Sequence, residues 1–307
     1  MSRSATVATA GELLRSGTEQ LRASGSESPR LDAELLLGHV LDIERTTVLA
    51  HPEVVVSDGR RTAYEALLER RTHGEPVAYL RGIKEFYGLA LAVDRRALIP
   101  RPESERLVEI ALDHVRQALT SAPRSSAAPP LSIWDVGTGS GAIAIALAVE
   151  LRRRGYGAAF TITATDLAPA ALTVALENAA AHGVADTIDF SAGDLLAVPA
   201  APASTDLLVA NLPYIPTADV PLLPVAASFE PVEALDGGAD GLQLIRRLLA
   251  QLPAALSQAG TAILEIGAGQ ADAALDAAAA MLPAWLASID ADLGGRPRVL
   301  VVRRGGA

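Results

Sequence analysis

The chain has 307 residues, half of them hydrophobic, and a formal net charge of −10 at pH 7. This length exceeds the usual size of a single core, so we expect one large domain or two unequal ones. There is no cysteine, which excludes disulfides, thiolate catalysis and cysteine-ligated zinc.

The distribution of charged, polar and apolar residues argues against several classes of protein. Nearly all of the net negative charge lies after residue 106, which argues against a broad phosphate-binding surface. The five histidines are scattered without metal-ligand spacing, and we expect no metal site. The first residues lead into no signal-type apolar core, and no apolar run is long enough to span a bilayer. A soluble, cytoplasmic protein is therefore expected.

The first quarter of the chain has the residue spacing of helices. Leucines recur at helical intervals within residues 8–50, and Ser28-Pro29 offers a cap and a first-turn proline for a further helix. Residues 58–73 also have a helical pattern, which ends near Gly74. Together these segments predict a small helical domain over residues 1–76.

Residues 77–99 differ in character from the helical part. Short, apolar, β-like runs at Val77–Leu80 and Leu89–Val93 are separated by glycines, which predicts a β-hairpin linker. A stiff loop with two prolines at residues 100–105 then leads into a helix. The composition of Thr120–Pro130 is typical of a flexible insert.

From residue 131 onward, strand-like runs alternate with helical segments. This alternation predicts a doubly wound, Rossmann-like α/β domain over residues 100–307, in which helices cover both faces of a mostly parallel sheet. Gly294-Gly295 ahead of the last apolar run predicts a terminal antiparallel hairpin. The expected strands are 131–136, 160–165, 187–191, 205–210 and 261–266, and the expected helices are 141–153, 168–181, 242–252 and 271–281.

One predicted strand, Leu207–Ala210, ends at Asn211-Leu212-Pro213-Tyr214. Pro213 stops the strand, so an amide and a phenol are held on a stiff turn at the carboxyl end of the sheet, where ligands bind. A planar NH2 group can donate its protons to the Asn211 oxygen and to a backbone carbonyl, while Tyr214 stacks on its face. The turn thus suits a weakly nucleophilic nitrogen, and the alternative is an ordinary Asn-Pro turn.

A glycine-rich loop follows the first strand of the sheet and contains Gly137, Thr138, Gly139, Ser140 and Gly141. Glycines let a ligand approach the backbone closely, and the helix that follows supplies free N–H groups. The pattern predicts a nucleoside cofactor, although the glycines could serve only strand–helix packing.

Acidic residues follow the next two strands. Asp166 is placed to accept protons from both ribose hydroxyls, Asp194 to accept from an adenine amino group, and Leu195 to pack on the ring. The alternative for Asp194 is a turn residue.

The glycine loop alone does not identify the cofactor, and features outside it favour one candidate. Gly-x-Gly-x-x-Ala also fits the fingerprint of dinucleotide-binding enzymes, so a dehydrogenase stays an alternative. The terminal hairpin and the turn at Asn211 favour S-adenosylmethionine, because hydride transfer has no evident use for that turn.

These residues together resemble the class I S-adenosylmethionine-dependent methyltransferases and, more narrowly, the release-factor glutamine methyltransferases of the HemK/PrmC family. The resemblance covers nearly the whole chain, and its ordered series of motifs is highly specific. The motifs are Pro29–Leu36, Gly74–Leu80, Leu98–Glu103, Asp135–Gly141, Asn211–Pro216, Phe229–Pro231, Ala234–Gly238 and Leu264–Gly267.

The resemblance implies a seven-stranded methyltransferase sheet and methyl transfer to the side-chain nitrogen (N5) of the glutamine in the Gly-Gly-Gln motif of peptide chain release factors. It implies that Gly137–Gly141 hold the methionine part of S-adenosylmethionine, that Asp166 holds the ribose, and that Asp194 and Leu195 flank the adenine. Asn211–Tyr214 would bind the glutamine amide, and the helical domain would help to dock the release factor. We expect a monomer with no stable binding to nucleic acid or membrane.

The chain departs from the family pattern at one position. The family motif usually reads Asn-Pro-Pro-Tyr, whereas Leu212 replaces the first proline here but keeps the carbonyl of that position. The spelling Asn-Leu-Pro-Tyr also occurs in adenine N6-methyltransferases that act on ribosomal RNA. An adenine methyltransferase acting on RNA or DNA is therefore the nearest alternative, although the acidic charge counts against it. A non-enzymatic protein-binding scaffold with the same fold is a further alternative.

Overall fold

The computed structural model describes residues 8–120, 129–198, 204–292 and 294–305. Most of the predicted insert at Thr120–Pro130 therefore lies outside the described residues. Contacts divide the chain into two compact units. The first comprises residues 1–83 with 224–229, and the second comprises residues 84–223 with 230–307.

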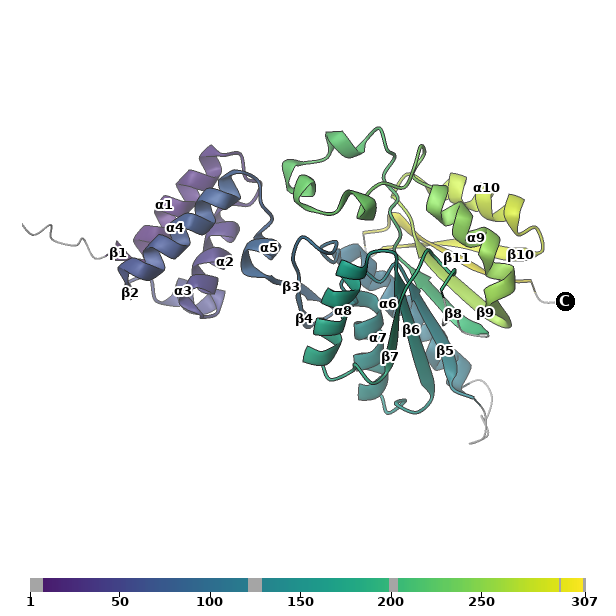
Figure 1. Ribbon diagram of the computed structural model, residues 1–307. Helices are drawn as coiled ribbons and strands as arrows, with labels where there is room; N and C mark the ends of the chain where they lie inside the picture. The colour runs from purple at the N-terminus through teal and green to yellow at the C-terminus, as the bar shows by residue number, and fades with distance from the viewer. Residues whose placement is uncertain (1–7, 121–128, 199–203, 293, 306–307) are drawn as a thin grey trace, which may run out of the picture. The chain divides into compact units, whose positions relative to one another are not determined.

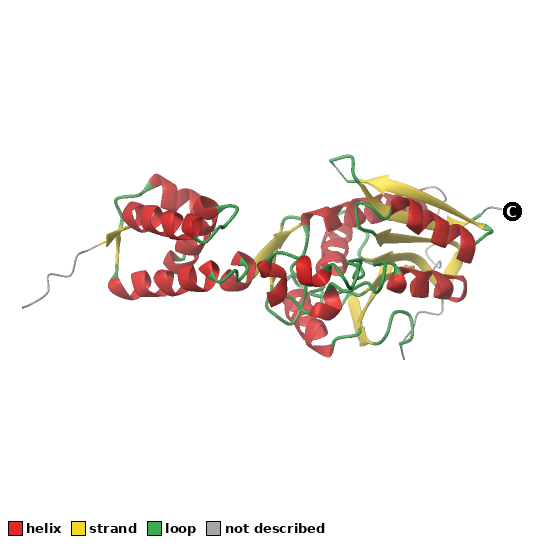
Figure 2. Ribbon diagram, turned by 90° about the horizontal axis from the view of Figure 1, so that it is seen from above, coloured by secondary structure: helices red, strands yellow, loops and turns green. Residues whose placement is uncertain are grey.

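The first unit is almost entirely helical (Figure 2). Thr9 and Glu12 form a reciprocal capping box at the start of its first helix, and Pro29 occupies the first turn of the second. Leu21, Leu36 and Tyr64 are fully buried in its core. Its elements are α1 (Ala10–Ala23), α2 (Pro29–Leu41), α3 (Arg45–Ala50), α4 (Asp58–Thr72) and α5 (Val77–Arg81), with a short pairing of β1 (Ala8–Thr9) and β2 (Val55–Val56).

The β-like run predicted at Val77–Leu80 is wrong, because these residues form helix α5. Pro76 caps the helix and Gly82 ends it in the left-handed conformation, at φ +69°. A short apolar run fits either a strand or a buried helical turn, and periodicity cannot separate the two. The predicted hairpin lies after α5 and consists of β3 (Ile83–Phe86) and β4 (Leu89–Ala92).

The second unit is built on a seven-stranded sheet of the predicted kind, with an antiparallel hairpin at its end (Figure 1). The strand order is β10-β11-β9-β8-β5-β6-β7, and only the pairs β10/β11 and β11/β9 are antiparallel among the described pairs. The strands are β5 (Leu131–Val136), β6 (Phe160–Asp166), β7 (Ile188–Ala192), β8 (Thr205–Ala210), β9 (Leu256–Glu265), β10 (Trp285–Ala291) and β11 (Pro297–Arg304).

Helices cover both faces of this sheet. Successive residues of a strand point to opposite faces, so Ile133 joins the core under α6 and α7, whereas Trp134 joins the core under α9 and α10. Helix α8 packs beside α7 against β6 and β7. The helices are α6 (Glu105–Thr120), α7 (Ala142–Arg153), α8 (Pro169–Ala181), α9 (Gln243–Ala255) and α10 (Ala271–Met281), with a 3-10 turn at Pro102–Ser104 before α6.

The chain order of the strands reverses at β5. Strands β6 and β7 extend from one side of β5, whereas β8 and β9 extend from the other. In open α/β sheets the ligand crevice lies at such a reversal, at the carboxyl ends of the strands. Because Val136 pairs with Ala210, Gly137 and Asn211 leave the sheet side by side.

Asn178, a buried residue of α8, links the hairpin to the glycine loop. Its side-chain nitrogen donates to the carbonyls of Ala92 and Ser140, both at 3.0 Å, and its side-chain oxygen accepts from the Ala92 N–H at 2.7 Å. A buried amide that makes three such bonds fixes the backbone of both partners.

Replacing Asn178 with alanine should lower the free energy of unfolding by about 3 kcal/mol, because buried partners lose their hydrogen bonds. Chemical denaturation followed by tryptophan fluorescence measures this, since Trp134 and Trp285 both lie in the sheet. Glu177→Ala on the same helix is the control, with an expected loss of about 1 kcal/mol or less, because Glu177 makes an exposed ion pair with Arg96. Equal losses in the two variants would contradict the link.

Asp135 is fully buried at the end of β5. Its Oδ2 accepts from the Thr138 hydroxyl at 2.7 Å and from the Ala144 N–H at 3.2 Å, while Oδ1 has no hydrogen-bond partner among the described residues. Burial raises the pKa of Asp135 to about 7. The carboxyl therefore braces the glycine loop at the cost of burying an ionisable group.

The raised pKa of Asp135 predicts a pH-dependent stability. The folded state holds this proton more tightly than the unfolded state, so the contribution is complete below pH 4 and is lost as pH rises through 7. Asp135→Asn keeps an acceptor for both donors without the charge. It should therefore flatten the fall in unfolding free energy between pH 4 and 8 by up to about 4 kcal/mol. Denaturation curves across this pH range measure the difference, and parallel curves for the two proteins would refute the assignment.

Candidate active site

The glycine loop joins β5 to α7 and lies at the carboxyl edge of the sheet. The N–H groups of Gly137 and Thr138 both donate to the Thr165 carbonyl of β6. Gly137 and Gly139 have φ of +73° and +56°, which side chains rarely adopt. A Cβ at Gly137 would lie 3.0 Å from the Leu212 side chain, whereas a Cβ at Gly139 would meet open space. The loop is thus backed by the Asn211 turn and leaves its backbone open to a ligand.

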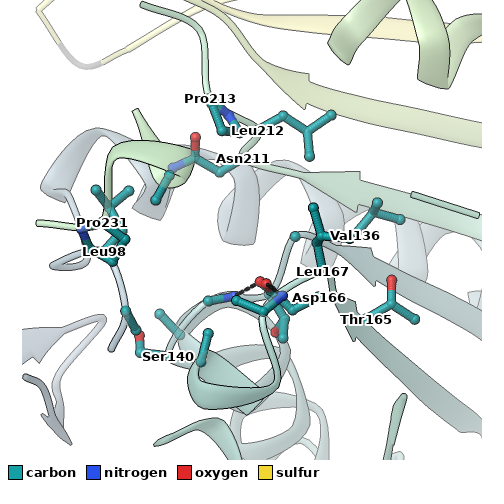
Figure 3. A pocket seen from close by; sticks show the side chains of 18 of the residues that line it. Leu98, Val136, Ser140, Thr165, Asp166, Leu167, Asn211, Leu212, Pro213 and Pro231 are labelled. Carbon is teal, nitrogen blue, oxygen red and sulfur yellow. Dashed lines mark hydrogen bonds between the residues drawn. The ribbon is translucent and has the colours of Figure 1, made fainter. Parts of the chain in front are cut away.

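Asp166, the last residue of β6, faces the same space as the loop (Figure 3). Its Oδ2 accepts from the Gly139 N–H at 2.8 Å and its Oδ1 from the Ala168 N–H at 2.9 Å. Burial raises the pKa of Asp166 despite these donors. Each carboxylate oxygen accepts more than one hydrogen bond, so Asp166 shapes the loop and keeps capacity for ligand hydroxyls.

Asn211 directly follows β8, as predicted, and its side chain is held by residues far away in the sequence. Its Nδ2 donates to the Ser104 hydroxyl oxygen at 2.8 Å, and that hydroxyl donates to Glu265 Oε2 at 2.6 Å. Ser104 lies in the turn before α6, and Glu265 ends β9. With its nitrogen engaged, the Asn211 carboxamide offers its oxygen as the acceptor at the cavity wall.

The rest of the Asn211 turn is fixed by backbone contacts. Leu212 is buried in the core beneath the sheet edge. A Cβ at Gly237 would lie 2.6 Å from the Pro213 carbonyl oxygen, so this close approach requires glycine. The Tyr214 carbonyl accepts from Gln270 Nε2 at 2.8 Å. The turn therefore has little freedom to move.

Most of the predicted site residues line one cavity of about 400 Å³. Gly141 and Tyr214 are not among its described lining residues. The Cα of Gly141 faces Ile145 and Ala175 in the packing of α7 against α8. The predicted residues that line the cavity are Gly137, Thr138, Gly139, Ser140, Asp166, Asp194, Leu195, Asn211, Leu212 and Pro213.

Tyr214 lies near Glu265 and is not among the described residues that line the cavity. Burial, followed by the Glu265 carboxyl, raises the pKa of its phenol to about 12. The phenol is therefore protonated at neutral pH and can donate a hydrogen bond.

Asp194 and Leu195 follow β7 at the far side of the cavity. Asp194 Oδ2 accepts from the Arg247 guanidinium at 2.6 Å, and both side chains are partly exposed. Leu195 has φ +55° and is buried. Asp194 therefore forms an ion pair with an arginine of the same chain, and the sequence pattern does not reveal this pair.

Sequence reasoning missed the groups that hold this site together. Besides Ser104 and Glu265, the buried Glu230 pairs with Arg101 at 2.6 Å and accepts from the Ile99 N–H at 3.1 Å. This pair ties the loop before α6 to the segment after the Asn211 turn. The motifs near these four side chains can be recognised in the sequence. Their spacing in the sequence does not indicate which motif contacts which.

The described residues contain no group of three or more histidine, aspartate or glutamate side chains placed to hold a metal ion. Among the same residues, no helix has the length and apolar character needed to cross a bilayer.

Comparison with known proteins identifies both parts of the chain. Residues 12–82 match the PrmC N-terminal domain family and residues 133–228 match a methyltransferase domain family. The catalytic domain of human METTL16, solved in complex with MAT2A 3′UTR hairpin 1, covers 80% of this chain and 81% of its own, with a TM-score of 0.54. At 14% identity this likeness shows the fold alone.

Two curated relatives match over nearly the full length. The release factor glutamine methyltransferase of Rhodospirillum rubrum is 41% identical over 298 residues, which cover 96% of this chain and 85% of the relative. The release factor glutamine methyltransferase of Deinococcus radiodurans is 38% identical over 296 residues, which cover 96% of this chain and 98% of the relative. With this identity over both parts of the chain, the protein belongs to the release factor glutamine methyltransferase family.

Proposed function

We propose that this protein transfers a methyl group from S-adenosylmethionine to the side-chain amide nitrogen (N5) of the glutamine in the Gly-Gly-Gln motif of peptide chain release factors. The observation that carries the proposal is the placement of Asn211. Asn211 lines the same cavity as the glycine loop and Asp166, and the bond from its Nδ2 to Ser104 leaves its carboxamide oxygen as the end available to a substrate. Relatives with the corresponding name match over nearly the whole chain.

The cavity fits a nucleoside cofactor with a charged amino-acid tail. Gly139 leaves open space above its backbone, so the tail can lie against the loop and the first turn of α7. Asp166 keeps acceptor capacity for two ribose hydroxyls, and the buried Leu195 offers an apolar surface for an adenine ring. S-adenosylmethionine bound here supplies a methyl group already activated by its sulfonium.

The turn at Asn211 provides what a glutamine amide lacks. An amide nitrogen is a poor nucleophile because its lone pair is delocalised into the carbonyl. The Asn211 oxygen and the Leu212 carbonyl each accept one N–H of the substrate, which keeps electron density on nitrogen and stabilises the positive charge that develops there. The nitrogen then loses one proton to solvent, and in-line positioning needs no covalent intermediate.

The same acceptors provide selectivity. A glutamate side chain has nearly the shape of glutamine but no N–H to donate, so its carboxylate would face two oxygens without a proton between them. The turn has little freedom to rearrange and relieve that repulsion, because Gly237 packs against the Pro213 carbonyl and Gln270 donates to the Tyr214 carbonyl. We therefore infer that the site takes a primary amide.

The helical unit is the part of the chain that we expect to bind the protein substrate. Residues 12–82 match the PrmC N-terminal domain family, and we infer that this unit docks the release factor. The methyltransferase fold is shared with enzymes of other substrates, so the partner rests on family membership and not on the fold.

Asn211→Ala should lower the rate of glutamine methylation by about 100-fold or more, because one of the two acceptors is lost. Single-turnover methylation of a release factor measures the rate. Calorimetry with S-adenosylhomocysteine is the internal control and should show a dissociation constant within about threefold of the original. Normal methylation by this variant would exclude the amide clamp.

Asp166→Ala should raise the dissociation constant of S-adenosylhomocysteine by about 30-fold, because charge-assisted bonds to the ribose are lost and Gly139 is freed. Calorimetry measures this directly. Asp186→Ala is the matched control, since Asp186 is an exposed aspartate paired with Arg152 and should leave binding unchanged. Identical affinities for all three proteins would remove Asp166 from the cofactor site.

The substrate itself is tested by mass spectrometry. Incubation with S-adenosylmethionine and a release factor should add one methyl to the glutamine of its Gly-Gly-Gln motif. A variant release factor with glutamate at that position, and an RNA of equal concentration, should gain none. Methylation of the RNA in place of the protein would select the adenine methyltransferase alternative.

A further inference from the structure

Three side chains from three separate segments form a chain of hydrogen bonds that starts in the cavity wall, which Asn211 and Ser104 both line, and ends at Glu265. Asn211 Nδ2 donates to Ser104 Oγ at 2.8 Å, and Ser104 Oγ donates to Glu265 Oε2 at 2.6 Å. Ser104 is 3% exposed and Glu265 is 1% exposed, so water does not compete for these bonds. Asn211 alone of the three carries a role in the proposed reaction.

The chain of bonds has one direction. A serine hydroxyl has a single proton, and the ionised Glu265 carboxylate, which prevails above pH 7, accepts it. Ser104 Oγ can therefore meet Asn211 only as an acceptor, so the NH2 end of the Asn211 carboxamide must face it. The oxygen end is left for the cavity.

This direction removes an ambiguity in the Asn211 side chain. The two ends of a carboxamide are nearly equal in size, so packing alone does not choose between two orientations related by a 180° turn. In the turned orientation, Asn211 would present its NH2 to the substrate NH2, and two donors would face each other. The ionised Glu265 carboxylate can only accept, and through Ser104 it excludes that state.

We propose that Ser104 and Glu265 are positioning residues that orient the Asn211 carboxamide, and thereby make the site prefer a substrate that brings NH2 over one that brings a carboxylate. The inference rests on the proposed function, which it deepens. Glu265 is not among the described residues that line the cavity, and Ser104, which does line it, uses its hydroxyl to accept from Asn211 and donate to Glu265. Both residues therefore act through Asn211.

Two substitutions change the polarity in different ways. Ser104→Ala removes the acceptor and leaves Asn211 free to turn. Glu265→Gln is nearly isosteric but can donate its NH2 to Ser104 Oγ, whose proton then goes to the Asn211 oxygen and reverses the whole chain of bonds. Ser104→Thr keeps a hydroxyl and should restore what Ser104→Ala loses.

The sheet offers a matched control. Ser257, near the start of β9, donates to the Asp206 carboxylate at 3.0 Å, which repeats the serine–carboxylate pair at the opposite edge of the sheet from the cavity. Ser257→Ala should keep the rate and the substrate preference.

The experiment uses the full chain with saturating S-adenosylhomocysteine and two forms of one release factor, with glutamine or glutamate in the Gly-Gly-Gln motif. The readout is the ratio of their dissociation constants, together with the methylation rate of the glutamine form. We expect Ser104→Ala to reduce the ratio and the rate by about tenfold each, and Glu265→Gln to reduce the ratio further by strengthening binding of the glutamate form.

The affinity for S-adenosylhomocysteine shows whether each variant is folded, because the glycine loop and Asp166 are unchanged. If Ser104→Ala does not bind S-adenosylhomocysteine, the inference is tested by comparing Ser104→Thr and Glu265→Gln with the original protein. Equal loss of affinity for both forms of the release factor, or an unchanged ratio in Glu265→Gln, would overturn the inference. Failure of the unaltered protein to methylate the glutamine would instead overturn the proposed function.

Discussion

The parallel pairing of β5 with β8 is the constraint on which the site depends. Val136 lies opposite Ala210, so the two strands end at the same level and release the glycine loop and the Asn211 turn next to each other. The contact of Leu212 with Gly137 then sets their separation, because no side chain fits between them. A cofactor loop and a substrate turn that are 70 residues apart by number are thus brought to one edge by a single strand register.

Buried carboxyl groups organise this edge. Asp135 braces the start of α7, Asp166 holds Gly139, and Glu265 receives the Ser104 hydroxyl. Burial raises the pKa of all three, to about 7 for Asp135 and Glu265. In these contacts the three carboxyl groups accept from backbone N–H groups and a serine O–H group. These donors orient the carboxyl groups but do not neutralise their charge. The fold therefore gives up some stability at neutral pH to keep acceptors in fixed places.

Long-range polar contacts build the walls of the cavity. Glu230 fastens the loop before α6 through Arg101 and the Ile99 N–H, and Asn178 fastens the hairpin to the glycine loop. Each contact uses a nearly fully buried side chain that would be costly to leave unpaired. The segments that surround the cavity are therefore held rigid, as electrostatic preorganisation of an amide requires.

The sequence by itself determined the α/β alternation, the glycine loop, Asp166 and the turn at Asn211, because periodicity, glycine and proline act locally. The expected activity came from motifs that resemble those of a known family. Tertiary structure decided three points: that Val77–Leu80 is helical, that Tyr214 lies outside the described cavity lining, and that Ser104 and Glu265 form a chain of hydrogen bonds with Asn211. These depend on which buried polar groups meet across the sheet, and a hydrogen bond between distant segments leaves no periodic trace in one sequence.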